Sequence, residues 1–217
     1  MVGACRCSSH SAPPARPDDV IDDVTDDNES VSDIIAKANK DIESAMTEGD
    51  VKSDGRRNAL HCSSCKWPKY GKYVSIYYHF SNKYSECWSY IGRVLYYRRQ
   101  SLSLSSACLT TATVQHELFH ALGFTHEHSR SDRDDHVTVH YENILPDKKH
   151  NFKKYRTNNL YTPYDFDSVM QYQNWAWTSN REMTLTSKEN PKLMLGIAKS
   201  ASDNDFLRVN RYYKCPV

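Results

Sequence analysis

The sequence predicts an α+β fold that is preceded by a partly disordered segment. Two kinds of pattern predict the folded part: β-branched or aromatic runs typical of strands, and segments with helix start and stop signals. A third observation, an acidic start with few apolar residues, predicts the disorder. The 217 residues allow one ordinary domain and an extra segment. We expect a mostly disordered segment with one short helix over 1–57 and a folded domain over 58–217.

The composition gives no support for a nucleic-acid or membrane partner. Two of its features disagree on whether the protein is exported. The net charge of +1 gives no reason to expect nucleic acid, and no apolar run is long enough to span a membrane. The first 17 residues lack the apolar core of a signal peptide. Seven cysteines in a chain of this size nevertheless favour the disulfides of an exported protein.

The first 57 residues consist of an acidic start, a predicted helix and a charged, turn-rich end. Residues 1 to about 31 carry a run of aspartates and cannot bury enough apolar surface to fold. Asn28-Glu29-Ser30 is an N-glycosylation sequon, which matters only in an exported chain. The pair Arg56-Arg57 is either part of a solvated loop or a cleavage point, and the local sequence favours neither interpretation.

A helix is predicted between these parts. Ser30 and Asp33 fit a capping box, and Gly49 is expected to end the helix. The residues expected on its apolar face are Ile34, Ala38, Ile42 and Met46.

Four elements are predicted after Cys62. Residues 73–80 read as a strand, and residues 99–105 alternate as a half-exposed strand does. Residues 111–122 are predicted to be a helix stopped by Gly123. A last helix is predicted over 202–213, with Ser202 and Asp205 as a capping box. Its expected apolar face consists of Phe206, Val209 and Tyr213.

Three histidines with regular spacing predict a metal site. His116 and His120 lie four residues apart, on one face of the predicted helix. Gly123 can turn the chain back so that His126 becomes the third ligand. Three imidazoles with an open fourth position are typical of catalytic zinc. Glu117 lies beside them, where a general base acting on a water at the metal is needed.

The spacing H-E-x-x-H-x-x-G-x-x-H is specific because it fixes five positions. At roughly 1 in 20 per position, a chance match in a chain of this length is below about one in 10⁴. The remaining histidines of this region lack ligand spacing and read as loop or strand residues. They are His128, His136 and His140.

The residues around this motif resemble the astacin family of metzincins. "HEHSRSDRDDHV" is similar to the family's H-E-Q-S-R-x-D-R-D-x-Y-V, and "SVMQY" is similar to its S-x-M-H-Y turn. "TPYDFDSVM" and "RVNRYYKC" also fit, and "NALHCSSCKW" resembles the mature start of fish hatching enzymes, or choriolysins. The resemblance covers about 31–217. It implies a metzincin-like zinc protease domain with a reduced mixed sheet, an irregular lower half and a closing C-terminal helix.

The resemblance also implies residue roles. Met170 forms an apolar floor beneath the zinc, and Tyr172 stabilises the oxyanion. Glu127 receives the amino terminus of Asn58 that cleavage after Arg57 releases. Asp50 is the zymogen switch that blocks the metal, although an aspartate after Gly49 can also belong to a helix-ending turn.

One departure from the family is large. A long helix and two strands are missing between Ser85 and Cys87, so the N-terminal subdomain is truncated. We expect this loss to expose part of the apolar face of the zinc helix. That face consists of Val114, Leu118, Phe119 and Leu122.

The cysteines match the family in part. Cys87 and Cys108 match one family disulfide, and Cys62 and Cys65 match the local pair of the hatching branch. A lone CxxC can also bind zinc, but no second pair with zinc-finger spacing accompanies it. The family partner of Cys215 belongs to the missing stretch.

The resulting hypothesis is a zinc endopeptidase with one Zn²⁺ per chain, made as a zymogen and acting on extracellular protein. The resemblance implies a secreted monomer whose partner is a protein or peptide substrate. The alternative is a truncated, astacin-like protein that binds zinc without catalysis.

Overall fold

The computed structural model describes residues 29–40, 46–52, 65–71, 73–74, 76, 86–95 and 100–215. Most of the segment predicted to be disordered, residues 1–28 with the sequon's Asn28, lies outside these ranges, as does the pair Arg56-Arg57. The last residues of that prediction, up to about 31, are described and include the cap and the first residue of the first helix. Three α-helices are described: α1 (Val31–Ala38), α2 (Thr111–Leu122) and α3 (Asp203–Tyr212). None of the described helices is long and apolar enough to cross a membrane.

The described strands are short and form antiparallel pairs. An isolated parallel bridge between Val51 and Ser89 links the first pair to the third. The strands are β1 (Met46–Thr47) with β2 (Val51–Lys52), β3 (Lys69–Tyr70) with β4 (Tyr73–Val74), β5 (Cys87–Trp88) with β6 (Ser103–Leu104), and β7 (Val137–Val139) with β8 (Leu185–Ser187). The predicted α+β class is therefore confirmed.

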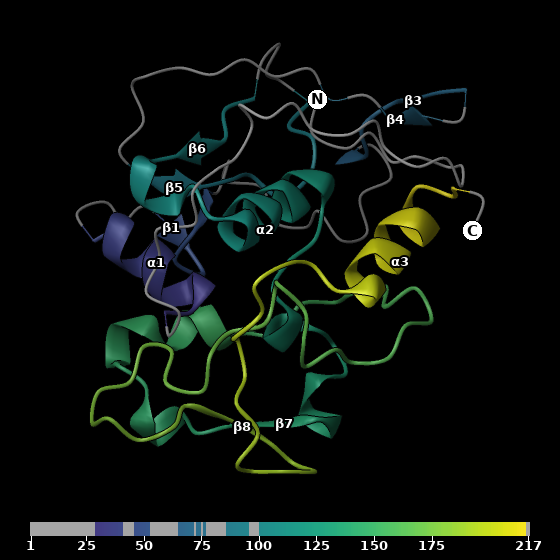
Figure 1. The fold of residues 1–217 in the computed structure, drawn as a ribbon. Helices are drawn as coiled ribbons and strands as arrows, with labels where there is room; N and C mark the ends of the chain where they lie inside the picture. The colour runs from purple at the N-terminus through teal and green to yellow at the C-terminus, as the bar shows by residue number, and fades with distance from the viewer. Residues whose placement is uncertain are drawn as a thin grey trace.

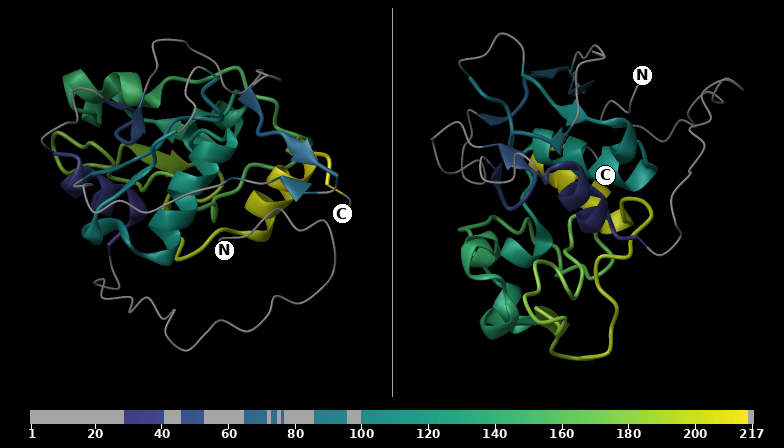
Figure 2. Two further views of the ribbon diagram at one scale, coloured as in Figure 1. Left: turned by 90° about the horizontal axis from the view of Figure 1, so that it is seen from above. Right: turned by 90° about the vertical axis from the view of Figure 1, so that its left-hand side faces the viewer.

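These elements form two halves (Figures 1 and 2). The upper half holds α2, α1 and the β5–β6 pair, and the lower half is mostly irregular chain around β7 and β8. Short 3₁₀ turns lie before α2 and along the lower half. They are η3 (Ser106–Cys108), η4 (Glu127–Ser129), η5 (Arg133–Asp135), η6 (Tyr141–Asn143) and η7 (Pro146–Phe152).

The predicted boundaries of α2 are confirmed, because local signals fix both ends. Thr110 caps the first turn, with its side chain accepting a hydrogen bond from the Thr113 amide at 3.1 Å. Gly123 ends the helix with φ of 107°, a left-handed conformation that few other residues adopt.

The capping box of α3 is confirmed, but its predicted apolar face is partly wrong. Ser202 and Asp205 form the box, and Val209 and Tyr213 are buried. Phe206 is 50% exposed, while Arg208 is buried instead. The helix turns Asp205 and Arg208 inward because both find charged or polar partners there.

The predicted extent of the first helix is wrong. The α1 helix has the predicted cap at Ser30 but ends at Ala38, where Asn39 is the C-cap. Met46, expected on the helix face, pairs with Lys52 in the β1–β2 hairpin. Gly49 lies in the turn of that hairpin with φ of 85°.

The predicted strands are only partly recovered. Within 73–80, Tyr73–Val74 is a strand, while residues 75 and 77–80 lie outside the described ranges. Within 99–105, residue 99 lies outside the described ranges, and of residues 100–105 only Ser103–Leu104 is a strand. Gln100 is not part of a strand. Its side chain donates to the Gly92 carbonyl and accepts from the Val94 amide, each at 2.8 Å.

A disulfide joins Cys87 in β5 to Cys108 before α2, as predicted. The other predicted pair remains a prediction because Cys62 lies outside the described residues. Cys215 is buried in the apolar cluster that includes Ile34, Ile35 and Phe119, which we call the upper core.

The upper core includes the helix from the N-terminal segment. Ile34 and Ile35 of α1 belong to the same apolar cluster as Ala112 and Phe119 of α2. The expected exposure of the α2 face is therefore limited. Phe119 is buried, and the other three residues of that face are half-buried.

We expect Ile35→Ala to destabilise the whole upper half. The side chain is 3% exposed, and truncating a buried isoleucine costs about 2–5 kcal/mol. Leu109→Ala, at a residue that is 43% exposed, is the control and is expected to cost much less. Chemical denaturation followed by circular dichroism measures both. If the two variants lost the same free energy of unfolding, α1 would not be part of the core.

Candidate metal centre

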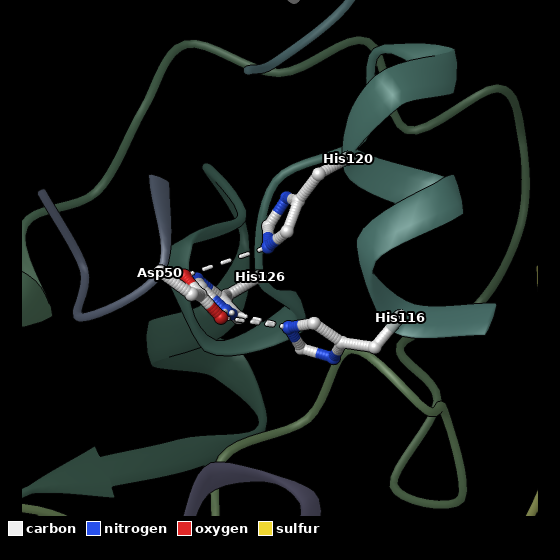
Figure 3. Close-up of side chains that lie close together, drawn as sticks. All are labelled: Asp50, His116, His120 and His126. Atoms are coloured by element: carbon white, nitrogen blue, oxygen red, sulfur yellow. Dashed lines mark hydrogen bonds and ion pairs between the residues drawn. The ribbon is translucent and has the colours of Figure 1, made fainter. Parts of the chain in front are cut away.

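Three imidazoles converge at the C-terminal end of α2 (Figure 3). His116 and His120 project from adjacent turns of the helix, and His126 follows the Gly123 turn as the N-cap of η4. Together with Asp50 they form a buried group whose potential ligand atoms all lie within 4.8 Å of one another. The structure thus brings the three predicted ligands together.

The outer nitrogen of each imidazole has a fixed partner. His116 Nδ1 lies 2.8 Å from the Val169 carbonyl oxygen, and His120 Nδ1 lies 2.8 Å from the Phe124 carbonyl oxygen. A carbonyl only accepts, so each of these Nδ1 atoms carries the proton, leaving the Nε2 lone pair free for a metal. His126 Nδ1 contacts the carboxylate of Glu48.

The inner nitrogens fit a zinc ion. His116 Nε2 and His126 Nε2 lie 3.2 Å apart. Zinc–nitrogen bonds of about 2.0–2.1 Å at tetrahedral angles place two ligand nitrogens about 3.3 Å apart. His120 Nε2 is buried and has no hydrogen-bond partner among the described residues. Such an orphaned acceptor, aimed at the other two, is expected where a cation binds.

Asp50 supplies a fourth group from the β1–β2 turn. Its Oδ2 lies 2.9 Å from His116 Nε2 and 3.2 Å from His126 Nε2, and its Oδ1 lies 3.6 Å from His120 Nε2. Burial works to raise the pKa of Asp50, but the positive potential of His126 and His120 outweighs it and holds the pKa well below its usual range. The carboxylate is therefore ionised in the position of a metal ligand.

Glu117 lies next to the ligands without binding another group. It is fully buried, and neither carboxylate oxygen has a hydrogen-bond partner among the described residues. Burial, helped by the negative charge of Asp50, raises its pKa well above the usual value. A buried carboxyl group with a raised pKa and free oxygens is suited to accepting and returning a proton.

Tyr172 and Met170 lie in the segment before α3, and the Tyr172 ring centroid is 4.5 Å from that of His126. Tyr172 is buried, and its hydroxyl donates a hydrogen bond to the Glu48 carbonyl. Burial, with the charges of Asp50 and Glu48, raises the pKa of Tyr172 well above its usual value, so the hydroxyl keeps its proton. Met170 is buried in the upper core, and its carbonyl accepts from the Glu127 amide at 2.9 Å.

No role was predicted for the Glu48 side chain, although the "EGD" of Glu48 to Asp50 resembles the pro-segment motif of the astacin family. The Glu48 amide donates to Asn151 Oδ1 at 2.9 Å, and its carboxylate contacts His126 and Thr125. These contacts require φ of 57°, a left-handed conformation rare for a residue with a side chain. That motif does not predict these contacts, because all these partners lie far along the chain.

His128 was predicted to be an ordinary loop residue, yet it is part of the site. Its ring stacks on that of Tyr172, with centroids 4.0 Å apart and planes at 29°. Burial, together with the charge of His126, lowers the pKa of His128 to about 3, so the ring is neutral. Its Nε2 lies 3.1 Å from the Asn151 carbonyl oxygen. Neither His136 nor His140 belongs to the metal cluster.

Glu127 has several partners, most of them on Oε1. Arg208 of α3 binds it through two nitrogens at 2.6 and 2.7 Å, and the Asp165 amide donates to it at 2.8 Å. Arg130 adds a longer contact of 3.3 Å. The carboxylate joins α3 to the segment that follows the third histidine. Asn58, its predicted partner after cleavage, lies outside the described residues.

A chain of hydrogen bonds connects α3 to the first histidine. Asp205 accepts from Ser168 Oγ at 2.6 Å and from the Val169 amide at 3.0 Å. The Val169 carbonyl is the group that orients His116. A residue 89 positions after the ligand thus fixes the turn that holds it.

We expect Asp205→Ala to weaken zinc binding roughly 10–100-fold, as is typical when partners of metal ligands are removed. The turn at 168–169 loses both of its acceptors, so His116 is no longer held. Asp203→Ala, at an exposed residue in the first turn of α3, is the control. Competition with a chromophoric chelator measures the affinity. Unchanged affinity in a folded Asp205→Ala protein would contradict this link.

Comparisons with known proteins agree with this geometry. Residues 58–214 match the profile of Astacin (Peptidase family M12A). The chain is 37% identical over 231 positions to the low choriolytic enzyme of Oryzias latipes, covering 86% of this chain and 84% of that enzyme. It is also 39% identical over 153 residues to meprin A subunit beta of Rattus norvegicus, covering 69% of this chain but 21% of that protein.

A solved structure shows the same fold. High choriolytic enzyme 1, a hatching enzyme zinc-protease from Oryzias latipes, superposes with a TM-score of 0.58 at 37% identity. The match covers 67% of this chain and 76% of that one. With three histidines in zinc geometry, a matched family profile and this structural likeness, the chain belongs to the astacin family of zinc metalloproteases.

Proposed function

We propose that this chain is the zymogen of a secreted, monomeric endopeptidase that hydrolyses peptide bonds in extracellular protein, as hatching enzymes do. One observation carries the proposal: the Asp50 carboxylate lies between three ligand imidazoles, beside the unpaired carboxyl group of Glu117. The imidazoles and Glu117 are the groups of a catalytic site. Asp50 is the residue with which the N-terminal segment of the chain fills that site.

Each residue has a distinct role in this proposal. His116, His120 and His126 hold the zinc, which when bound acidifies water and polarises the scissile carbonyl. Glu117 takes a proton from the attacking water and returns it to the leaving amine. The absence of hydrogen-bond partners for its carboxylate in the described part of the chain supports this role.

Tyr172 is proposed to stabilise the oxyanion by donating its hydroxyl hydrogen. In this structure the hydroxyl donates to the Glu48 carbonyl, an oxygen of the N-terminal segment. Departure of that segment therefore frees the donor for substrate. Met170, buried beside the site, supports it from below.

Latency is proposed to depend on Asp50 and to end with cleavage after Arg57. Asp50 fills the position that a substrate carbonyl or water needs, and the same turn engages Tyr172 through Glu48. The new amino terminus at Asn58 is proposed to bind Glu127. A cavity of about 40 Å³ borders Glu127 and supports that proposal.

The alternative is a chain that binds zinc but does not catalyse. The alignment with the low choriolytic enzyme extends over 231 positions, whereas this chain has 217 residues, so the relative carries residues that this chain lacks. This difference supports the proposed loss between Ser85 and Cys87. It favours the alternative if the missing elements are needed for substrate binding.

We expect Glu117→Gln to reduce casein cleavage by about 10²–10⁴-fold, the usual loss when a general base is removed. The change preserves size and removes the proton acceptor, so bound zinc should remain at one per chain. The full chain is produced under oxidising conditions, cleaved with an arginine-specific protease and assayed. Zinc is measured by atomic absorption.

The same pair of proteins separates the two functions. Activity of the cleaved wild type well above that of Glu117→Gln supports the endopeptidase. Equal, background activity with one zinc in each supports the inactive protein.

A further inference from the structure

The outer edge of β5 is fully occupied by residues of the N-terminal segment. Antiparallel pairing with β6 uses one edge of β5, so the backbone groups of Cys87 and Ser89 face the other edge. The Ser89 amide donates to the Asp50 carbonyl at 3.0 Å, and the Ser89 carbonyl accepts from the Lys52 amide at 2.9 Å. This edge therefore adjoins the metal centre, because Asp50 contacts both.

The Cys87 groups on that edge bind a side chain instead of a backbone. The Cys87 amide donates to Asn39 Oδ1 at 2.8 Å, and the Cys87 carbonyl accepts from Asn39 Nδ2 at 2.6 Å. A second hydrogen of Nδ2 reaches the Gly49 carbonyl at 2.8 Å. Asn39 is 0% exposed, so its carboxamide is a built part of the interior.

A carboxamide offers one acceptor and a donor, as a peptide group does. Asn39 thus places the equivalent of one peptide unit against Cys87. Extended peptides bind open strand edges through these same backbone groups. We propose that Asn39 is a peptide mimic that closes the β5 edge against substrate, as a lock separate from Asp50. This inference rests on the proposed function, which requires a peptide substrate at the metal centre.

The α1 helix holds Asn39 in a fixed position. This residue is the C-cap of α1, and its amide bonds to the Ile35 carbonyl at 2.9 Å. The apolar side of α1 is buried in the upper core, so the helix holds the carboxamide in place. None of the three side-chain bonds involves a histidine. Loss of the Asp50 contact with the imidazoles therefore leaves this lock closed.

The test measures binding rather than catalysis. All proteins are uncleaved full chains carrying Glu117→Gln, which prevents turnover, and Asp50→Ala, which opens the metal side. Into this background we introduce Asn39→Leu, which removes all three bonds, and Asn39→Asp, which keeps the shape but loses the donor. Lys40→Ala, at the exposed neighbouring residue, is the matched control. The probe is fluorescein-labelled β-casein, followed by fluorescence anisotropy.

Both Asn39 variants are expected to bind casein about tenfold more tightly or better. Asn39→Leu removes both hydrogen bonds that compete at Cys87, and Asn39→Asp removes the one to the Cys87 carbonyl. Lys40→Ala is expected to bind like the background. Hydrogen exchange at residues 86–89 reports whether the Cys87 amide has lost its partner, and exchange in α2 reports whether the fold is intact. Faster exchange at Cys87 with unchanged casein affinity would overturn the proposal.

The two proposals fail in different ways. Tighter casein binding by the Asn39 variants, with no cleavage by the processed wild type, refutes the endopeptidase and leaves the lock. Cleavage by the processed wild type, with casein affinity insensitive to Asn39, refutes the lock and leaves the endopeptidase.

Discussion

The need to pair a buried carboxylate governs this structure. Asp50 is 2% exposed, and an ionised group at such depth is stable only beside opposite charge or a metal. A cation held by the three imidazoles would meet that need, and the β1–β2 turn that carries Asp50 lies beside them. The same hairpin includes the buried Glu48 and the bridge from β2 to Ser89, and α1 before it lies in the upper core. The described residues of the N-terminal segment therefore include several that are as deeply buried as those of the domain.

The metal centre also joins the two halves of the molecule. Its histidines come from α2 and the following turn, but the groups that orient them come from Val169, Phe124 and Glu48. The α3 helix then secures both sides, through Asp205 to the turn at 168–169 and through Arg208 to Glu127. Distant parts of the chain therefore act on one site through short, buried hydrogen bonds.

Local signals predicted what depends on local contacts. The boundaries of α2 follow from Thr110 and Gly123, and the three ligands follow from spacing on that helix. The end of α1 was missed because Asn39 is held by Cys87, 48 residues away. The burial of Arg208 was missed because its partner Glu127 lies 81 residues earlier. The contacts of Glu48 were not predicted, since the one with Tyr172 spans 124 residues.

The Gly49 turn packs tightly against an aromatic ring. A Cβ at Gly49 would lie 2.8 Å from Trp177 Cζ2, so the backbone of the turn rests on the indole and no larger residue fits. Tryptophan emission depends on how much water reaches the ring. Withdrawal of the turn in the proposed activation would uncover this indole, which is one of four tryptophans in the chain. A change in tryptophan emission on cleavage would then report the proposed opening without substrate or label.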